Sequence, residues 1–245
     1  MQKSLFVYIT ILITVQGLYS DSRIKEKSYT DSYYYGGVVQ PAEESEREIW
    51  IGEKKMCSIS DNWKFILDIS QNLMVIVNRQ DSSYVECSLP FEWSKVVSPE
   101  LVGMLRSFET KGSVTPTGNM KKIDNWECQE YVVNSYILYQ GSKINENDTK
   151  IWASSEVLSD NENYDQLIRI MRKFANYDSS YIQQLGKITG YHVSRVSFFY
   201  PKGFSVSSNQ KIVEVIEIDP PAGLYEIPAG YSKKESLSLE EIRNL

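Results

Sequence analysis

Residues 63–89 read WKFILDISQNLMVIVNRQDSSYVECSL. Short segments rich in β-branched and aromatic residues alternate here with the turn dipeptides Gln71-Asn72 and Gln80-Asp81. This pattern is typical of an antiparallel meander whose strands are joined by hairpins. Its first strand places apolar side chains at alternate positions, and therefore on one face: Trp63, Phe65, Leu67 and Ile69. One side of the predicted sheet is strongly apolar and needs a cover.

Two helices are predicted as that cover. Ser98, Pro99 and Glu100 are typical of a helix start, and the helix that they open would run to Phe108. A stronger pattern lies at 164–175, where apolar residues recur at helical spacing and charged residues occupy the opposite side. The acidic residues that precede and open this segment disfavour the alternative of a helix attracted to an anionic membrane surface. We therefore expect the helix to lie on the apolar face of the sheet.

Further strands are predicted on both sides of the second helix. They lie at 111–123, 126–138, 150–154, 191–200 and 211–218. No repeat of solenoid length is present in the sequence. The order of these elements predicts the α+β class, with an antiparallel sheet covered by amphipathic helices in one domain.

The first twenty residues have the layout of a secretory signal peptide. Lys3 is followed by an apolar run over 5–18, and the chain becomes polar at 19–21. A run of about 14 residues is too short to span roughly 30 Å of hydrocarbon as a helix. Cleavage is allowed after Gly17 or Ser20, and no cysteine lies nearby to accept a lipid. We expect a cleaved signal over 1–20, no stable membrane span, and an exported protein that is periplasmic or secreted.

The remaining chain divides at residue 48. Residues 21–47 are polar and Tyr-rich, and we interpret them as a leader or as a frayed first strand. Residues 48–245 are expected to form the single folded domain.

Charge and residue counts exclude several classes of function. The chain has 26 Lys and Arg against 32 Asp and Glu, a formal net charge of −6, and this disfavours a nucleic-acid partner. His192 is the only histidine, so a site that needs two imidazoles cannot form. No metal-ligand spacing and no dinucleotide or phosphate-loop motif occurs in the sequence. We therefore expect no metal and no cofactor.

The sequence offers no catalytic residues. Cys57, Cys87 and Cys128 allow at most one internal disulfide, whose pairing the spacing does not decide. A nucleophilic cysteine would need His192 as its base, and no orienting Asp or Asn lies near that histidine in the sequence. A structural role for the cysteines is the simpler interpretation, and we expect a protein that is not an enzyme.

Four segments, in order, resemble a family. They are 48–56 (EIWIGEKKM), 123–131 (IDNWECQEY), 150–154 (KIWAS) and 221–231 (PAGLYEIPAGY), and the resemblance covers about 48–234. They are similar to segments of exported bacterial domains related to the LolA and LolB lipoprotein carriers. The last segment is the most specific. The carriers' arginine that holds the lid cannot be assigned to a matching motif here, and Arg106, Arg169 and Arg195 are equivalent candidates.

The resemblance implies a LolA-like fold, a half-open and strongly curved antiparallel sheet, or unclosed barrel, with helices as a lid over an apolar concavity. Relatives of this kind hold the acyl chains of lipoproteins in that concavity. The expected function is therefore an exported protein that binds or carries a lipid or a lipoprotein. The predicted ligand-binding residues are those of the inward apolar face: Trp63, Phe65, Leu67, Leu167, Met171 and Phe174.

A second function stays open. The same apolar face would form a filled core in a structural or interaction module of the cell envelope, whose partner binds the outside. A carrier would have an apolar pocket of several hundred Å³, whereas a packed module would have none larger than a water or two. The sequence indicates neither the ligand nor the oligomeric state.

Overall fold

The computed structural model describes residues 20–35, 37–158, 163–175, 177–200 and 204–245. Its strands are, in chain order, β1 (Asp21–Thr30), β2 (Tyr33–Tyr35), β3 (Val38–Gln40), β4 (Glu43–Ile51), β5 (Lys55–Ile59), β6 (Trp63–Asp68), β7 (Leu73–Asn78), β8 (Ser83–Ser88), β9 (Phe108–Ile123), β10 (Trp126–Tyr139), β11 (Ser142–Ser154), β12 (Tyr191–Tyr200), β13 (Val206–Ile218) and β14 (Ser232–Lys233). Its helices are α1 (Pro99–Arg106), α2 (Tyr164–Phe174), α3 (Ser179–Leu185) and α4 (Leu239–Arg243), with a 3-10 turn at Trp93–Lys95.

Twelve strands form one sheet, in the order β14-β8-β7-β6-β5-β4-β1-β13-β12-β11-β10-β9. Its neighbouring strands pair antiparallel except β14 and β8, which pair parallel, so the sheet is mixed. Within the described residues the sheet is not closed, because β14 and β9 are its two edges. The strands β2 and β3 form a separate hairpin.

The prediction of an α+β fold, with a curved antiparallel sheet covered by helices, is wrong. One large mixed sheet dominates the described part of the chain, and the helices are few and short. The longest, α2, has 11 residues, too few to cover more than part of one face. The prediction also made the sheet too small, because β11 has 13 residues and begins at Ser142 rather than at 150.

The hairpins of the meander follow from their turn residues. The turn from β6 to β7 has Asn72 at φ 57°, and the turn from β7 to β8 has Ser82 at φ 55°. Asparagine tolerates this left-handed region better than most residues do. The Asp68 carboxylate accepts a hydrogen bond of 3.0 Å from the backbone N–H of Gln71, which fixes the start of the first turn.

Residues 21–47, for which the sequence left open a leader or a frayed first strand, contribute to the main sheet. They contain β1, and β1 lies between β4 and β13, near the middle of the sheet. Residues 1–19 of the predicted signal peptide lie outside the described residues. Among the residues described, no helix is both long enough and apolar enough to cross a bilayer.

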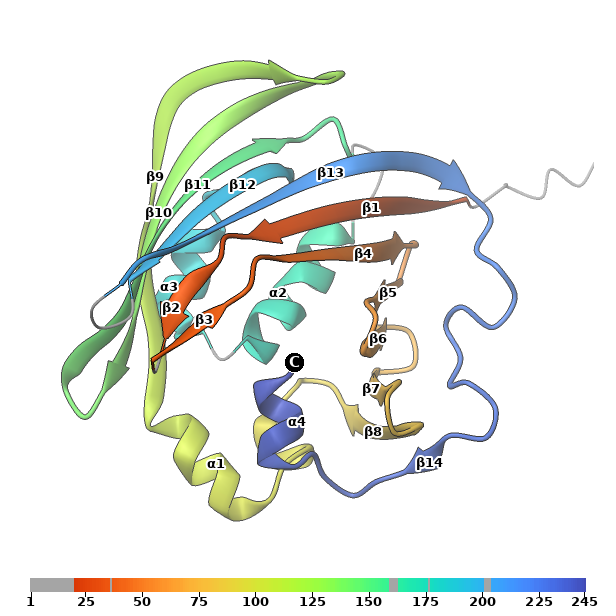
Figure 1. The fold of residues 1–245 in the computed structure, drawn as a ribbon. Helices are drawn as coiled ribbons and strands as arrows, with labels where there is room; N and C mark the ends of the chain where they lie inside the picture. The colour runs from red at the N-terminus through yellow and green to blue at the C-terminus, as the bar shows by residue number, and fades with distance from the viewer. Residues whose placement is uncertain (1–19, 36, 159–162, 176, 201–203) are drawn as a thin grey trace, which may run out of the picture.

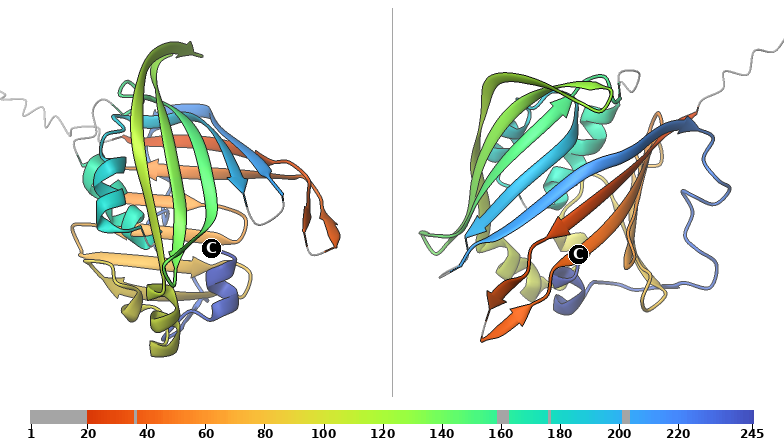
Figure 2. Two further views of the ribbon diagram at one scale, coloured as in Figure 1. Left: turned by 90° about the vertical axis from the view of Figure 1, so that its left-hand side faces the viewer. Right: turned by 45° about the horizontal axis from the view of Figure 1, so that its top comes forward.

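The sheet bends around α2, as Figure 1 shows, and therefore has two different faces. The inner face packs against α2 and α3. The outer face of β5, β6 and β7 is covered by residues 219–231, whose Leu224, Tyr225 and Ile227 pack on Cys57, Ile66 and Val75. Figure 2 shows the same curvature from two further sides. Since the covering segment is irregular, the apolar outer face is buried without a helix.

Candidate functional site

The inner face brings the predicted ligand-binding residues together. Three of them, Trp63, Phe65 and Leu67, come from β6, and the other three, Leu167, Met171 and Phe174, come from α2. All belong to one apolar cluster or pack directly against it. The rings of Phe65 and Phe174 meet edge to face with centroids 5.2 Å apart. Thus α2 packs on the strand face whose apolar alternation is visible in the sequence.

These residues differ in how far they are buried. Leu167, Leu67 and Trp63 retain 0%, 1% and 5% of their surface, so they are parts of a filled core. Phe65, Met171 and Phe174 are only partly buried at the margin of that core. A close-packed interior has no room for a ligand unless it repacks. In this conformation, only the three partly buried residues, Phe65, Met171 and Phe174, can form a binding surface.

The partly buried Trp93 and the buried Phe91 join this margin in what we call the aromatic cluster, made of Phe65, Phe91, Trp93 and Phe174. The Phe174 ring lies 5.2 Å from that of Phe91 and 5.1 Å from that of Trp93. Among the described residues, the buried indole N–H of Trp93 has no hydrogen-bond acceptor. Sequence reasoning missed both residues, because they lie in the short connection before α1, where no periodicity marks a buried side chain.

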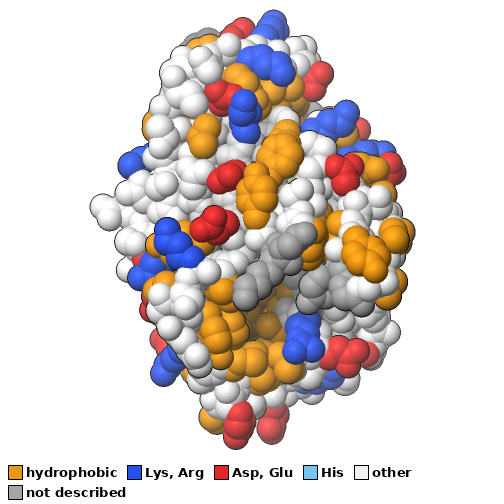
Figure 3. Space-filling view, turned by 60° about the vertical axis from the view of Figure 1, so that its left-hand side comes forward, with side chains coloured by type: hydrophobic (Ala, Val, Ile, Leu, Met, Phe, Trp, Pro, Cys, Tyr) orange, Lys and Arg blue, Asp and Glu red, His pale blue; other side chains and the backbone are white. Residues whose placement is uncertain are grey.

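Figure 3 shows that the molecule is hollowed on the side that it presents. Hydrophobic side chains form much of the wall of the hollow, and a cationic side chain lies at its rim. Exposed apolar concavities of this kind are where small apolar ligands bind.

Polar groups occupy another part of the inner face, centred on the buried carboxylate of Glu26. Its Oε1 accepts a hydrogen bond of 2.8 Å from the hydroxyl of Tyr191. Its Oε2 accepts bonds from Arg47, at 2.6 Å from Nη2 and 3.0 Å from Nε, and from Gln210 at 2.5 Å. Tyr191 also packs on Tyr164 of α2, with ring centroids 5.7 Å apart. Glu26 therefore connects its own strand β1 to three others, β4, β12 and β13, and Tyr191 links it to the helix.

Two further arginines lie near this network. Arg195 of β12 pairs with Gln210 across the strands, so the two side chains share the inner face. Arg172 lies on α2. Together with Arg47 they lower the pKa of His192 to about 3, first because burial disfavours its charged form and then because the three cations repel another proton. We call Arg47, Arg172 and Arg195 the inner arginines.

The inner arginines are reached by water yet enclosed by protein. The side chain of Arg47 is 47% exposed, and Arg195 is also exposed. Nevertheless burial lowers the pKa of Arg195, and the positive charge of Arg47 lowers it further. Burial is likewise the largest cause of the lowered pKa of Arg172. Side chains that a water molecule can touch, but that protein surrounds on most sides, line a concave space.

The single histidine gives a testable pH dependence. Because the pKa of His192 is about 3 in the folded protein and about 6.5 when unfolded, the unfolded state binds more protons between these values. The free energy of unfolding should therefore fall as pH decreases below about 6.5, by up to about 1.4 kcal/mol per pH unit. Urea unfolding from pH 7 to 5, above the range where ordinary carboxylates titrate, measures this slope. The variant His192→Gln should lack this pH dependence. Equal slopes in the native protein and the variant would show that the imidazole is not enclosed among cations.

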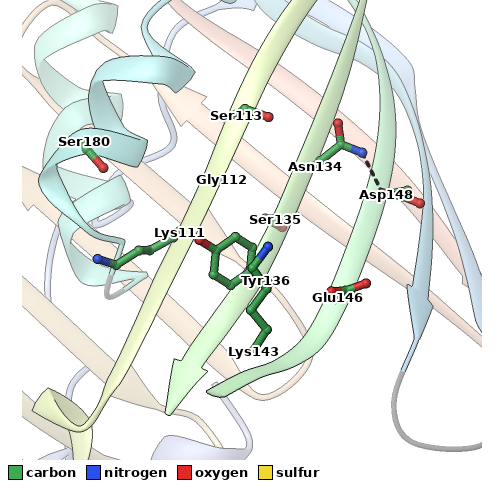
Figure 4. Close-up of a pocket in the computed structure, with 10 residues that line it drawn as sticks. All are labelled: Lys111, Gly112, Ser113, Asn134, Ser135, Tyr136, Lys143, Glu146, Asp148 and Ser180. Atoms are coloured by element: carbon green, nitrogen blue, oxygen red, sulfur yellow. Dashed lines mark hydrogen bonds between the residues drawn. The ribbon is translucent and has the colours of Figure 1, made fainter. Parts of the chain in front are cut away.

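Polar pockets lie at other places on the sheet. One, of about 440 Å³, lies over β9, β10 and β11 and is lined by Lys111, Asn134, Tyr136, Glu146 and Asp148 among others (Figure 4). A second, of about 820 Å³, lies over β4, β1 and β13. Their mixed charges are paired in part, as in the 2.6 Å bond from Asn134 to Asp148 and the 2.7 Å ion pair of Lys27 with Glu46. Neither pocket is lined by a residue of the predicted apolar site.

The cysteines are free thiols, and all three are buried. Burial raises the pKa of Cys57 to about 12 and that of Cys87 to about 11. Since the thiolate is the reactive form, these thiols are unreactive at neutral pH. Among the described residues, no group of three His, Cys, Asp or Glu side chains is placed to hold a metal ion.

Comparisons with known proteins add little. No protein-family model matches the chain, and no curated protein matches it. Among solved structures, a DUF1329 family protein from Desulfovibrio piger is similar over 86% of this chain and 91% of its own, with 10% sequence identity and a TM-score of 0.31. A likeness of this strength carries no argument about function. The resemblance to the LolA and LolB carriers therefore stays a prediction from the sequence.

Proposed function

We propose that this chain is an exported protein that binds a lipid or a lipidated partner on the inner face of its sheet. The observation that carries the proposal is that three rings of the aromatic cluster, those of Phe65, Trp93 and Phe174, are partly buried at the margin of the core and pack together. Aromatic and thioether side chains that are neither fully buried nor dispersed over the surface suit acyl chains. Export is supported by the apolar run at 5–18.

One observation favours the second candidate, an envelope interaction module with no ligand. Leu67, Leu167 and Trp63 are packed as a filled core, so only the margin of the apolar cluster is available to bind. The two functions differ in one measurable property, which is the uptake of an acyl chain.

We expect Met171→Glu to weaken binding of a fluorescent C16 fatty acid at least tenfold. Met171 is partly buried against the core cluster, and a carboxylate there would lose its hydration when an acyl chain covers it. Fluorescence titration measures the affinity, with circular dichroism as a check of folding. Gln166→Glu is the matched control, because it adds the same group at an exposed position of the same helix. A native protein that takes up no fatty acid would favour the interaction module.

A further inference from the structure

The inner face carries more positive charge than its own acidic groups neutralise. Glu26 already accepts hydrogen bonds from Tyr191, Arg47 and Gln210, so its two oxygens are occupied. Within the described part of the chain, neither Arg172 nor Arg195 forms an ion pair or a side-chain hydrogen bond. An enclosed cation without a partner destabilises the folded state, and in native proteins such a group usually forms an ion pair or binds a ligand.

The fold directs these charges toward one space. Arg195 and Arg47 lie on β12 and β4, three strands apart in the sheet, or roughly 14 Å between their backbones. The sheet curves around α2, the helix that carries Arg172, so side chains on its inner face are directed toward that helix. Glu26 lies between Arg47 and Arg195, because it accepts hydrogen bonds from Arg47 and from Gln210, and Gln210 is the cross-strand neighbour of Arg195. The three arginines are therefore grouped near Glu26 on the inner face, and all three lie close enough to His192 to affect its charge.

The part of the inner face around Glu26 adjoins the apolar surface formed by the aromatic cluster. Tyr164 packs against the core cluster, as do Met171 and Phe174 of the same helix. Its ring also packs on that of Tyr191, which donates a hydrogen bond to Glu26. One helix thus contributes both to the aromatic cluster and to the charged site. A ligand with an apolar chain and a charged end would match this arrangement.

We propose that Arg47, Arg172 and Arg195 bind an oxyanion, a carboxylate or a phosphate, that forms the head group of an amphipathic ligand whose chain lies on the aromatic cluster. The apolar chain of this ligand rests on the proposed function, whereas the oxyanion site is inferred from the three arginines alone. Arginine suits the role because its planar guanidinium donates two parallel hydrogen bonds to such groups. Arg47 would keep its bond to Glu26 and contribute its charge, while Arg172 and Arg195 supply free donors.

The test compares three probes on the purified protein: a fluorescent C16 fatty acid, its methyl ester and inorganic phosphate. The acid should bind at least tenfold more tightly than the ester, because only the acid is charged. Arg172→Gln and Arg195→Gln should each reduce this preference, and the double variant should abolish it. Arg169→Gln, at an exposed position of the same helix, is the matched control and should keep it.

His192 provides a readout in the unmodified protein. An oxyanion beside the inner arginines would change the electric field at the His192 imidazole, so its NMR signal, the only histidine signal of the chain, should shift on addition of the fatty acid at pH 7. No change in that signal while the acid binds would overturn the inference.

The remaining outcomes separate the inference from the proposed function. Equal, tight binding of acid and ester would overturn the head-group site and leave lipid binding standing. Arginine-dependent binding of phosphate without uptake of acid or ester would support the oxyanion site and overturn lipid binding. Binding of none of the probes would overturn both.

Discussion

Glu26→Gln should lower the free energy of unfolding by about 3 kcal/mol. Glu26 is 4% exposed and is the acceptor for Arg47, Gln210 and Tyr191. Removing one partner of a buried ion pair typically costs about 3–5 kcal/mol, because the other charge stays enclosed. The lower value applies here because water still reaches Arg47. In addition, the neutral amide leaves the repulsion between Arg47 and Arg195 without an opposing charge.

Urea unfolding at pH 7 measures this loss. The matched control is Glu46→Gln on the same sheet. The ion pair of Glu46 with Lys27 is exposed to solvent, and both side chains are more than half exposed. Such a pair contributes little, so the control should unfold like the native protein. A loss below about 1 kcal/mol for Glu26→Gln would mean that the inner arginines are well solvated, which contradicts an enclosed cationic site.

Leu167→Ala should have an effect of similar size, a loss of about 3–5 kcal/mol. Leu167 has no exposed surface and anchors α2 on the core of the inner face. Its truncation removes apolar contacts and leaves a cavity that the long strands around it cannot collapse to fill. Since α2 also carries Met171, Phe174 and Arg172, the same change should weaken binding of the fatty acid.

Ile168→Ala is the control for that variant. It removes a side chain of the same size one position along the helix, but Ile168 is partly exposed and does not belong to the core cluster. We expect a loss of about 1 kcal/mol or less. Equal losses in the two variants would contradict the orientation of α2 described above.

The meander and α2 were predictable from the sequence because both follow a simple periodicity. The turns at Asn72 and Ser82 and the alternation of Trp63, Phe65 and Leu67 are local signals. The extent of the sheet was not predictable in the same way. The C-terminal half of β9 is almost wholly exposed. Its residues, which include Gly118 and Asn119, show no alternation of apolar and polar side chains.

β1 shows why the charged site was missed. Its inner face carries Ser22, Glu26 and Ser28 besides Ile24, and that polarity is typical of a loop. The partners of Glu26 at Tyr191 and Gln210 lie 165 and 184 residues away in the chain, beyond the reach of local patterns. The one usable signal was that the single histidine, His192, lies in the same predicted strand as Arg195. The sequence offers Arg195 only as one of three candidates for a lid residue, since nothing in the sequence brings Arg47 to it.

Native mass spectrometry of the mature protein, purified from its own host and followed by lipid extraction, tests the central claim most directly. We predict a stoichiometric adduct that organic solvent releases as a lipid or an acylated peptide with an acidic head group. A protein that has only its apo mass, and that also takes up no fluorescent fatty acid, would contradict lipid binding on the inner face.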